Sequence, residues 1–541
     1  MNDYNNSRIR IANNRPVNES GRYVLYWCQA SRRLHANHAL DCALSWCRQL
    51  KKPLVVYEAV KRDYPWASPR HHTLMLDGMR DNAAAARKLG VAYWPFVATP
   101  DDPGRGLVGR LAADACLVVT DDYPAYIVPG HNRAVADRAG VAVHLVDTNG
   151  IVPLSLLGAA VSAAAHLRPR IQAQFADAWV HRAATTPAVS RAARSTLEPP
   201  FTPWDTRQDV SATIGRLDLA TTVPSVPGVT GGAVAGRGAL QAFVAKKLGN
   251  YAEERNQPDA PERNAASGLS AYLRYGHLGI QEVAEAVLGA DWSPAGINPR
   301  AKGKRDDYYC RDANVNAFLD EAITWRDVGY HWHFVRNAAC GPLVQGAKPV
   351  TWQALPGAAS LPHFNFETFD FSPGGERALE VVLPDWAKAT LRKHASDRRV
   401  YLYSLAEFES AATHDELWNA AQQELVATGR IHNYLRMLWA KKVLEWSESP
   451  TVAYQILEHL NNKYALDGRD PNSYTGILWC FGLFDRPWPP ERPVYGTLRY
   501  MSSDNTARKF KLAGYFEYVR GLTAGGQVRA GQTANRPNTL F

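Results

Sequence analysis

The sequence lacks the patterns that would place the protein in a membrane, outside the cell or around a structural metal. No apolar run reaches about 18 residues, the shortest length expected of a transmembrane helix, and the mean hydropathy is −0.31. The seven cysteines form no Cys-x-x-Cys pair. We therefore expect reduced thiols in a cytoplasmic protein, without a disulfide framework, a metal site or a membrane span.

The two ends of the chain also lack clear structural patterns. Residues 1–20 are polar and rich in Asn and Arg, without the apolar segment of a secretory signal. We expect them to form a disordered lead-in. Residues 523–541 combine a Gly-Gly pair with scattered polar residues, which predicts a flexible tail.

What the sequence does have is positive charge and tryptophan. The net charge of +9 and the pI near 9.1 suit a polyanionic partner such as nucleic acid. Many basic proteins have no such partner, so charge alone leaves the question open. Ten of the 16 tryptophans follow residue 290. Most of them should pack in a core, while some could stack on planar ligands or carry electrons.

The first part of the chain alternates apolar segments with amphipathic ones. This rhythm predicts βαβ units and a Rossmann-like, doubly wound parallel sheet in an α/β domain over residues 21–190. The expected strands are 23–27, 53–57, 91–97, 115–120 and 141–146, and the expected helices are 37–50 and 73–89. No Gly-x-Gly-x-x-Gly follows the first strand. We therefore expect the main cofactor to bind elsewhere.

The second part of the chain has a helical pattern almost throughout. Pro and Gly are frequent over residues 191–236, which predicts an interdomain linker. Apolar residues three and four apart then predict an all-α domain over residues 237–522. The helices with the strongest pattern are expected at 281–288, 315–324, 417–427 and 433–446.

Two segments of the helical part carry residues suited to a ligand. Trp439 and Trp446 are seven residues apart and share a helix face with Arg436, which needs an anionic or aromatic partner there. Residues 460–474 are rich in Asn, Asp and Arg, and predict a loop that interrupts the helices. This loop is either a capped surface connection or the polar lining of a site. The apolar continuation over residues 475–481 favours the lining.

Several long motifs in these regions resemble one known family. They are Ser267-Gly-Leu-Ser-Ala-Tyr-Leu-Arg-Tyr-Gly276, Leu435-Arg-Met-Leu-Trp-Ala-Lys-Lys442, Leu460-Asn-Asn-Lys-Tyr464 and Asp467-Gly-Arg-Asp-Pro-Asn-Ser-Tyr474. Together they resemble the class II cyclobutane pyrimidine dimer photolyases of the photolyase/cryptochrome family. The resemblance spans roughly residues 22–520 and is densest over residues 410–505.

The resemblance implies a helical domain that binds FAD and light-driven repair of DNA. An ion pair of Arg436 with Asp467 is implied beside the flavin ring, and Asn461 is implied at flavin N5. Phosphate oxygens of the cofactor need donors such as hydroxyl and backbone N–H groups. The whole implied FAD set is Tyr251, Lys247, Ser267, Gly268, Leu269, Ser270, Arg436, Asn461, Asp467 and Asp470.

The same resemblance implies a lesion pocket and an electron relay. Glu321 is implied at the carbonyl groups of the dimer, with Trp325 and Trp479 against its bases, as a flipped lesion requires apolar walls and a few polar groups. Asn461 completes the implied catalytic set. The implied relay to the flavin consists of Trp439, Trp418 and Trp446. UV-damaged DNA is the implied partner of a monomeric enzyme, and a deazaflavin or a folate is the implied antenna pigment.

Two alternatives within the family remain open. A cryptochrome-like photoreceptor would bind the same flavin without repair, and a (6-4) photoproduct photolyase would need a histidine near the lesion, for which His277 is the candidate. The segment 325–333, with Trp-Arg-Asp and then Gly-Tyr-His-Trp-His, departs from the family pattern and bears on substrate preference. No cysteine or carboxylate cluster accompanies His277, His331 and His333, so we expect no metal there.

Overall fold

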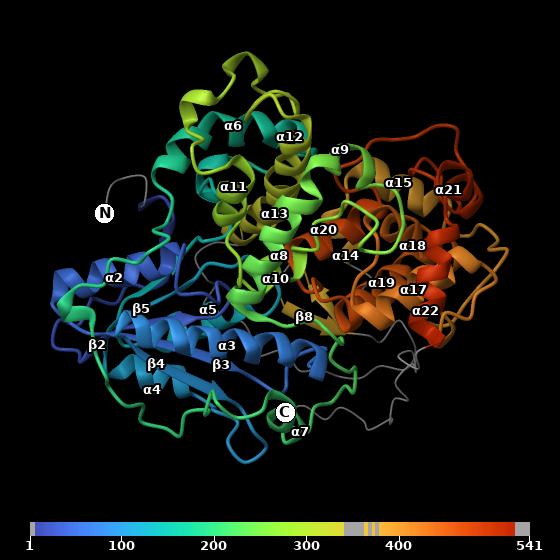
Figure 1. Cartoon of the computed structure of the whole chain (residues 1–541). Coiled ribbons are helices and arrows are strands. Elements are labelled where there is room, and N and C mark those ends of the chain that lie inside the picture. Colours follow the sequence, from blue (N-terminus) through green and yellow to red (C-terminus); the bar gives the residue numbers. More distant parts are fainter. Residues whose placement is uncertain (1–5, 340–361, 366–369, 374–377, 525–541) are drawn as a thin grey trace.

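The computed structural model describes residues 6–339, 362–365, 370–373 and 378–524 (Figure 1). A sheet with its covering helices forms one half of the molecule, and helices that follow in the sequence form the other. The expected tail beyond residue 524 lies outside the described residues. Among the helices described, none is long and apolar enough to cross a membrane.

A six-stranded sheet forms the core of the first half. Its order is β1-β6-β5-β2-β3-β4, and every pairing is parallel except that of β1 with β6. The strand order reverses between β2 and β5, which is the doubly wound arrangement expected from the sequence. The strands are β1 Ile9–Ile11, β2 Tyr23–Cys28, β3 Leu54–Val60, β4 Ala92–Val97, β5 Ala115–Asp121 and β6 Val143–Val146.

Helices cover both faces of this sheet (Figure 1). Apolar residues of α2 (His38–Leu50) pack on one face, and those of α4 (Leu107–Ala113) and α5 (Val128–Arg138) pack on the other. The helix α3 (Pro69–Leu89) also reaches the helical half. There its buried Arg70 donates to the carbonyl oxygens of Tyr464 at 2.9 Å and Val426 at 2.7 Å. This arginine links the two halves.

The expected disordered lead-in is wrong for part of residues 1–20. Ile9–Ile11 form β1, which pairs antiparallel with β6. The neighbouring Arg8 is 1% exposed and donates to the carbonyl oxygens of Asp147 at 3.1 Å and Gly150 at 3.2 Å. This segment is ordered despite its polar composition for two reasons. Carbonyl groups satisfy the buried guanidinium of Arg8, and the three residues of β1 pair with β6.

The second half is built from helices, with one antiparallel pair of strands that the sequence did not predict, β7 (Pro362–Asn365) and β8 (Asp370–Pro373). The helices are α8 Gly232–Lys246, α9 Tyr251–Glu254, α10 Ser270–Arg274, α11 Ile280–Leu288, α12 Ala313–Leu319, α13 Arg326–Ala339, α14 Ala378–Val382, α15 Asp385–Lys393, α16 Leu405–Glu409, α17 Glu416–Thr428, α18 Asn433–Trp446, α19 Pro450–Tyr464, α20 Pro471–Cys480, α21 Ser503–Lys509 and α22 Ala513–Ala524.

The boundary between the halves differs from the expected one. The helix α6 (Ala164–Val180) precedes residue 190, yet its Arg168 pairs with Asp320 at 2.7 Å and its Phe175 ring lies 6.1 Å from that of Trp292. These contacts place α6 with the helical half. The expected linker 191–236 includes α7 (Val210–Gly215) and the start of α8, and it runs along the sheet half (Figure 1).

The polar loop expected over residues 460–474 is shorter in the structure. Helix α19 continues to Tyr464 and α20 begins at Pro471, so the connection covers residues 465–470 only. The Asn462 side chain stays buried in α19 because its Oδ1 accepts the backbone N–H of Arg469 at 2.8 Å. An asparagine is thus tolerated near a helix end, where it fixes the following turn.

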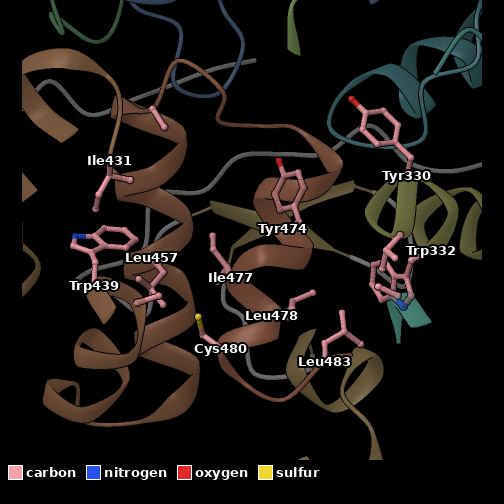
Figure 2. Packing of buried hydrophobic residues seen from close by; sticks show 14 of the residues in the cluster. Tyr330, Trp332, Ile431, Trp439, Leu457, Tyr474, Ile477, Leu478, Cys480 and Leu483 are labelled. Atoms are coloured by element: carbon pink, nitrogen blue, oxygen red, sulfur yellow. The ribbon is translucent and has the colours of Figure 1, made fainter. Parts of the chain in front are cut away.

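Helix α20 lies at the centre of the helical core. Figure 2 shows Tyr474, Leu478 and Cys480 on this helix, with Trp439 of α18 on one side and Tyr330 and Trp332 of α13 on the other. All of these residues except Trp332 are at most 2% exposed. The surrounding helices thus hold α20 in a fixed position next to the site described below.

Candidate functional site

A cavity of about 540 Å³ opens in the helical half. It lies between α10, α18, α19, α20 and the turn that precedes α13. Twelve of the residues singled out from the sequence line it: Tyr251, Ser267, Leu269, Ser270, Glu321, Trp325, Arg436, Trp439, Asn461, Asp467, Asp470 and Trp479. Of the others, Lys247, Gly268, Trp418 and Trp446 do not line it.

Glu321 and Trp325 reach the cavity from an unusual turn. Residues Asp320–Trp325 form the π-helical turn η6 between α12 and α13, where the sequence pattern predicted an ordinary helix. Such turns are often found at functional sites because they shift side chains relative to the helix around them. Trp325 is 42% exposed. It therefore offers an uncovered aromatic face at the cavity.

Arg255 is a partner of Glu321 that the sequence analysis missed. Its Nη1 lies 2.6 Å from Glu321 Oε1, and its guanidinium lies over the ring of Tyr251 at 5.3 Å. Desolvation raises the pKa of Glu321 above its usual value, while Arg255 acts in the opposite direction. The protonation of this carboxyl group is therefore set by burial against Arg255, with smaller opposing contributions from Asp320 and Arg305.

Trp479 of α20 forms another wall of the cavity and has two cations near its ring. The Nζ of Lys441 is 5.7 Å from its ring centroid, and the guanidinium of Arg499 is 5.2 Å from it. Lys441 is buried, donates to the carbonyl oxygen of Cys480 at 2.6 Å, and has its pKa lowered to about 8 by desolvation. Contacts of this kind fix the plane of the indole.

A charged pair and a free amide face the middle of the cavity. Arg436 of α18 contacts Asp467 with its Nη1 at 3.1 Å and its Nη2 at 3.2 Å. Asn461 of α19 is 3% exposed, and its Nδ2 has no hydrogen-bond partner among the described residues. A buried amide donor without a partner is unusual in proteins. It fits a ligand that offers an acceptor at this position.

The segment before α10 supplies hydroxyl groups to the same cavity. Ser267 and Ser270 line it, and Gly268 between them adopts φ +69°. A Cβ at Gly268 would lie 3.1 Å from Nη1 of Arg430, whose Nη2 donates to the Gly268 carbonyl at 3.4 Å. Lys247 lies outside the cavity wall but donates to the carbonyl oxygens of Pro261 and Ala266 in this region. Two cations therefore lie near the two serines.

The three relay tryptophans lie together in an order that sequence spacing does not give. Trp418 is in the middle, with its ring centroid 6.4 Å from that of Trp439 and 6.1 Å from that of Trp446. The Trp418 and Trp439 rings are nearly parallel, at 7°. Trp418 Nε1 donates to the carbonyl oxygen of Trp439 at 3.0 Å, and Trp439 Nε1 donates to Gln422 at 2.9 Å. Of the three rings, only Trp439 lines the cavity.

The sequence analysis missed Arg274 and Arg326 of the cavity wall and two tyrosines behind it that hold the predicted Asp470. Asp470 accepts hydrogen bonds from the hydroxyl groups of Tyr330 at 2.7 Å and Tyr123 at 3.1 Å. Arg326 lies over the Tyr330 ring at 4.0 Å, and Arg274 lies over the Tyr123 ring at 5.8 Å. Arg274 stands in a motif quoted above, which could have identified it. The contribution of Tyr123 from the sheet half has no local sequence signal.

A second cavity, of about 140 Å³, lies where the strand order of the sheet reverses. It is lined by aromatic residues from the carboxyl ends of the strands and the segments that follow them, including Trp27, Tyr57 and Tyr126. In doubly wound sheets this position is the usual one for ligands. Arg274 lines both cavities, so the two sites share a wall.

Among the described residues, no histidine lines the larger cavity. His277 is buried, and its Nδ1 accepts the backbone N–H of Gly232 at 3.0 Å. His331 is hydrogen-bonded through Nε2 to the carbonyl oxygen of Gly158 at 2.9 Å. Within the described part of the chain, no group of three or more His, Cys, Asp or Glu residues is arranged to hold a metal ion.

Known proteins resemble this chain over nearly its whole length, although no family model matches it. The deoxyribodipyrimidine photo-lyase of Methanothermobacter thermautotrophicus is 33% identical over 520 residues, covering 95% of this chain and 98% of the relative. That of Oryza sativa subsp. japonica is 31% identical over 552 residues, covering 99% and 94%.

Two solved structures share the fold at lower identity. A class III photolyase from Agrobacterium tumefaciens has a TM-score of 0.57 and 16% identity, with 96% of this chain and 95% of that chain covered. An archaeal photolyase from Sulfolobus tokodaii, solved with two FAD molecules, has a TM-score of 0.56 and 14% identity, with 96% of each chain covered. Both support the arrangement of an α/β half followed by a helical half.

Proposed function

Because the chain belongs to the deoxyribodipyrimidine photo-lyase family, we propose that it repairs cyclobutane pyrimidine dimers in DNA under light, with FAD in the larger cavity. The observation that carries this proposal is one cavity lined by Glu321, Trp325 and Trp479 together with the Arg436–Asp467 pair. The first three residues suit a flipped dimer, and the last two suit a flavin.

The residues of the cavity fit FAD. Asn461 Nδ2 is buried without a partner in the described structure and would donate to the flavin ring. The hydroxyl groups of Ser267 and Ser270, with Arg430 and Lys247 close by, are suited to the phosphates. When bound and reduced, FAD supplies on excitation by light the electron that opens the cyclobutane ring.

Arg436 and Asn461 set the electrostatics around the ring. A guanidinium favours negative charge beside it, and Asp467 holds this guanidinium in place through three contacts of 3.1 to 3.3 Å. The Asn461 amide donates a hydrogen bond without being an acid. An aspartic acid at this position would instead bring a transferable proton.

Glu321, Trp325 and Trp479 bind the lesion in this proposal. The two indole rings stack against the bases, and Glu321 in its protonated form donates to a carbonyl oxygen of the dimer. The raised pKa of Glu321 supports this role, because a carboxyl group must keep its proton in order to donate it. Arg255 competes with this role, since it favours the carboxylate.

Trp439, Trp418 and Trp446 restore the reduced state of the cofactor. Trp439 lines the cavity and is the inner end of the series, Trp418 is its middle member, and Trp446 is its outer member. Ring centroids 6.1 to 6.4 Å apart leave little space between neighbouring indoles. This spacing supports electron transfer in two short steps rather than in one long one.

The smaller cavity is the proposed site of an antenna pigment, either a deazaflavin or a folate. Its aromatic lining suits a planar chromophore, and it shares Arg274 with the larger cavity. A pigment held there would lie close to the flavin site. Both candidates absorb light that can be passed on to FAD.

The cavity favours neither of the two alternatives within the family, a (6-4) photoproduct photolyase and a photoreceptor without repair activity. A (6-4) photoproduct photolyase would need a histidine at the lesion, but His277 is buried elsewhere and lines no part of the cavity. A photoreceptor without repair activity would not need a lesion pocket, whereas Glu321, Trp325 and Trp479 all face the cavity together.

The proposal is tested with a Glu321→Gln variant and an oligonucleotide that contains a thymine dimer. Glutamine keeps the size of the side chain but cannot supply the proton, so repair should slow by about 100-fold, the lower end of the range for a positioned acid. The FAD content should stay at the wild-type level. Loss of FAD instead would place Glu321 at the cofactor and contradict the assignment.

A further inference from the structure

The aromatic series does not end at Trp446. Two rings pack on its outer side, His414 with its centroid at 4.9 Å and Tyr403 at 5.8 Å. A third, Tyr401, stacks on His414 at 3.7 Å and 19° and is 44% exposed. The buried tryptophans are thus connected to the surface by two tyrosines and a histidine.

The hydrogen bonds of Tyr403 fix the direction of its proton. The backbone N–H of His414 donates to the Tyr403 hydroxyl oxygen at 3.0 Å, and the same oxygen lies 2.7 Å from His414 Nδ1. Because the oxygen already accepts the amide hydrogen, we assign its own hydrogen to the bond with Nδ1. His414 then carries its ring hydrogen on Nε2, and Nδ1 is a proton acceptor.

Main-chain contacts hold this pair against the end of α18. The backbone N–H of Tyr403 donates to the carbonyl oxygen of Trp446 at 3.1 Å, and Arg399 Nε donates to that of Ser447 at 3.2 Å. His414 stands just before α17, the helix that carries Trp418. Both partners are therefore fixed by the elements that hold the relay, and the exposed imidazole can release a proton to water.

We propose that Tyr403 and His414 form a proton-coupled terminus of the tryptophan relay. This inference rests on the relay named in the proposed function. An electron passes from Tyr403 to oxidised Trp446 while the phenolic proton moves to His414 Nδ1, which leaves a neutral tyrosyl radical, neutral Trp446 and an imidazolium. Tyr401 takes no part in the transfer, and its ring holds the imidazole in plane.

A soluble thiol completes the cycle. Its thiolate form gives one electron to the tyrosyl radical, the imidazolium returns the proton to the phenolate oxygen, and the thiyl radical that remains combines with a second one to a disulfide. Once Tyr403 is the oxidised residue, Trp446 is neutral again. The return of the electron from the cavity to the oxidised tryptophan is then prevented.

The test follows radicals in the FAD-loaded, oxidised protein after a light flash, by transient absorption and electron paramagnetic resonance. The wild type should show a tyrosyl radical whose formation slows in D₂O. Tyr403→Phe should show tryptophan radical only. Tyr401→Phe is the matched control, since it keeps its stacking ring, and should leave the tyrosyl signal unchanged.

The role of His414 is tested separately. His414→Ala should slow tyrosyl formation by about 100-fold, as expected for loss of a positioned proton acceptor, and added imidazole should restore it. A tyrosyl signal that persists in Tyr403→Phe, or that is lost in Tyr401→Phe, would overturn the inference. A wild type that forms only a tryptophan radical would also overturn the inference, but it would leave the proposed tryptophan relay intact. Absence of any tryptophan radical would overturn the relay itself.

Discussion

Removing the cation beside Glu321 gives a direct test of how the lesion pocket works. Arg255→Met deletes the guanidinium that lies 2.6 Å from Glu321 Oε1 and keeps an apolar stem against Tyr251. If protonated Glu321 donates to the dimer, repair falls as the pH rises through its pKa. Because Arg255 lowers this pKa, removing Arg255 should move the fall in repair to higher pH.

The size of the shift follows from the geometry of the pair. Unit charges about 4 Å apart interact by about 4 kcal/mol at an effective dielectric constant of about 20, whereas exposed pairs retain up to about 1 kcal/mol. The two side chains are 18% and 34% exposed, so the pair lies between these limits. One pKa unit corresponds to about 1.4 kcal/mol, so the pH at which repair falls to half should rise by about one to two units.

The assay is the repair yield of a dimer-containing oligonucleotide at saturating DNA, measured from about pH 4, near the usual pKa of a glutamic acid, to about pH 9. Arg263→Met is the matched control, since Arg263 is exposed and pairs with Asp259 outside the cavity. Its profile should coincide with that of the wild type. An Arg255→Met profile that is unshifted, or shifted to lower pH, would refute the proposed proton donation by Glu321.

Three further predictions concern the relay, a buried acid and a glycine. Trp418→Phe should strongly slow bleaching of oxidised flavin by light and thiol, because it removes the middle ring of the relay. Desolvation raises the pKa of buried Asp327 from 3.8 to about 7, so the stability it contributes is present at acid pH and is lost as the pH rises through about 7. Asp327→Asn should flatten this loss, at most about 4 kcal/mol, in melting temperatures recorded from acid to alkaline pH. Gly268→Ala should cost about 1 kcal/mol and weaken FAD retention, since φ is +69° and the new Cβ would approach Arg430. Gly238→Ala, where no atom lies within 4 Å of the added Cβ, should cost nothing in thermal unfolding.

Each of these three predictions has an outcome that would contradict it. Unchanged bleaching in the Trp418 variant would mean that electrons reach the cavity by another path. An unchanged pH profile in the Asp327 variant would show that this carboxyl group stays charged in the folded protein. Equal melting temperatures for the two glycine variants would show that the Gly268 segment adapts to a side chain.

The sheet was predictable because its strands are short apolar runs separated by amphipathic helices. Residues 23–27 and 115–120, for example, correspond to β2 and β5 within one residue at their ends. The strand β1 was not predictable from its residues. It depends on antiparallel pairing with β6, in which Ile9 lies opposite Val146, 137 residues further along the chain.

The candidate site was recognised in part because its motifs are local. Arg436 and Trp439 stand three residues apart on α18, and periodicity alone puts them on one side of the helix. By contrast, the pairing of Arg255 with Glu321 and the place of Trp418 between Trp439 and Trp446 depend on how distant helices pack. Periodicity within a segment carries no information on such contacts.

The π-helical turn is another feature that the sequence pattern does not predict. Residues 315–324 have the apolar spacing of an α-helix, and the sequence contains no proline or glycine there to mark an interruption. The structure nevertheless changes from α12 to η6 at Asp320, which pairs with Arg168 of α6. The extra residue in this turn is accommodated by tertiary contacts, which a propensity scale does not include.

The central claim is tested most directly by illuminating the reduced, FAD-loaded protein with two oligonucleotides, one with a cyclobutane thymine dimer and one with a (6-4) photoproduct. Our account predicts that thymine absorbance recovers with the first, does not recover with the second, and does not recover in the dark. Failure to recover with the cyclobutane dimer, while FAD remains bound and can be photoreduced, would contradict the account and favour a photoreceptor.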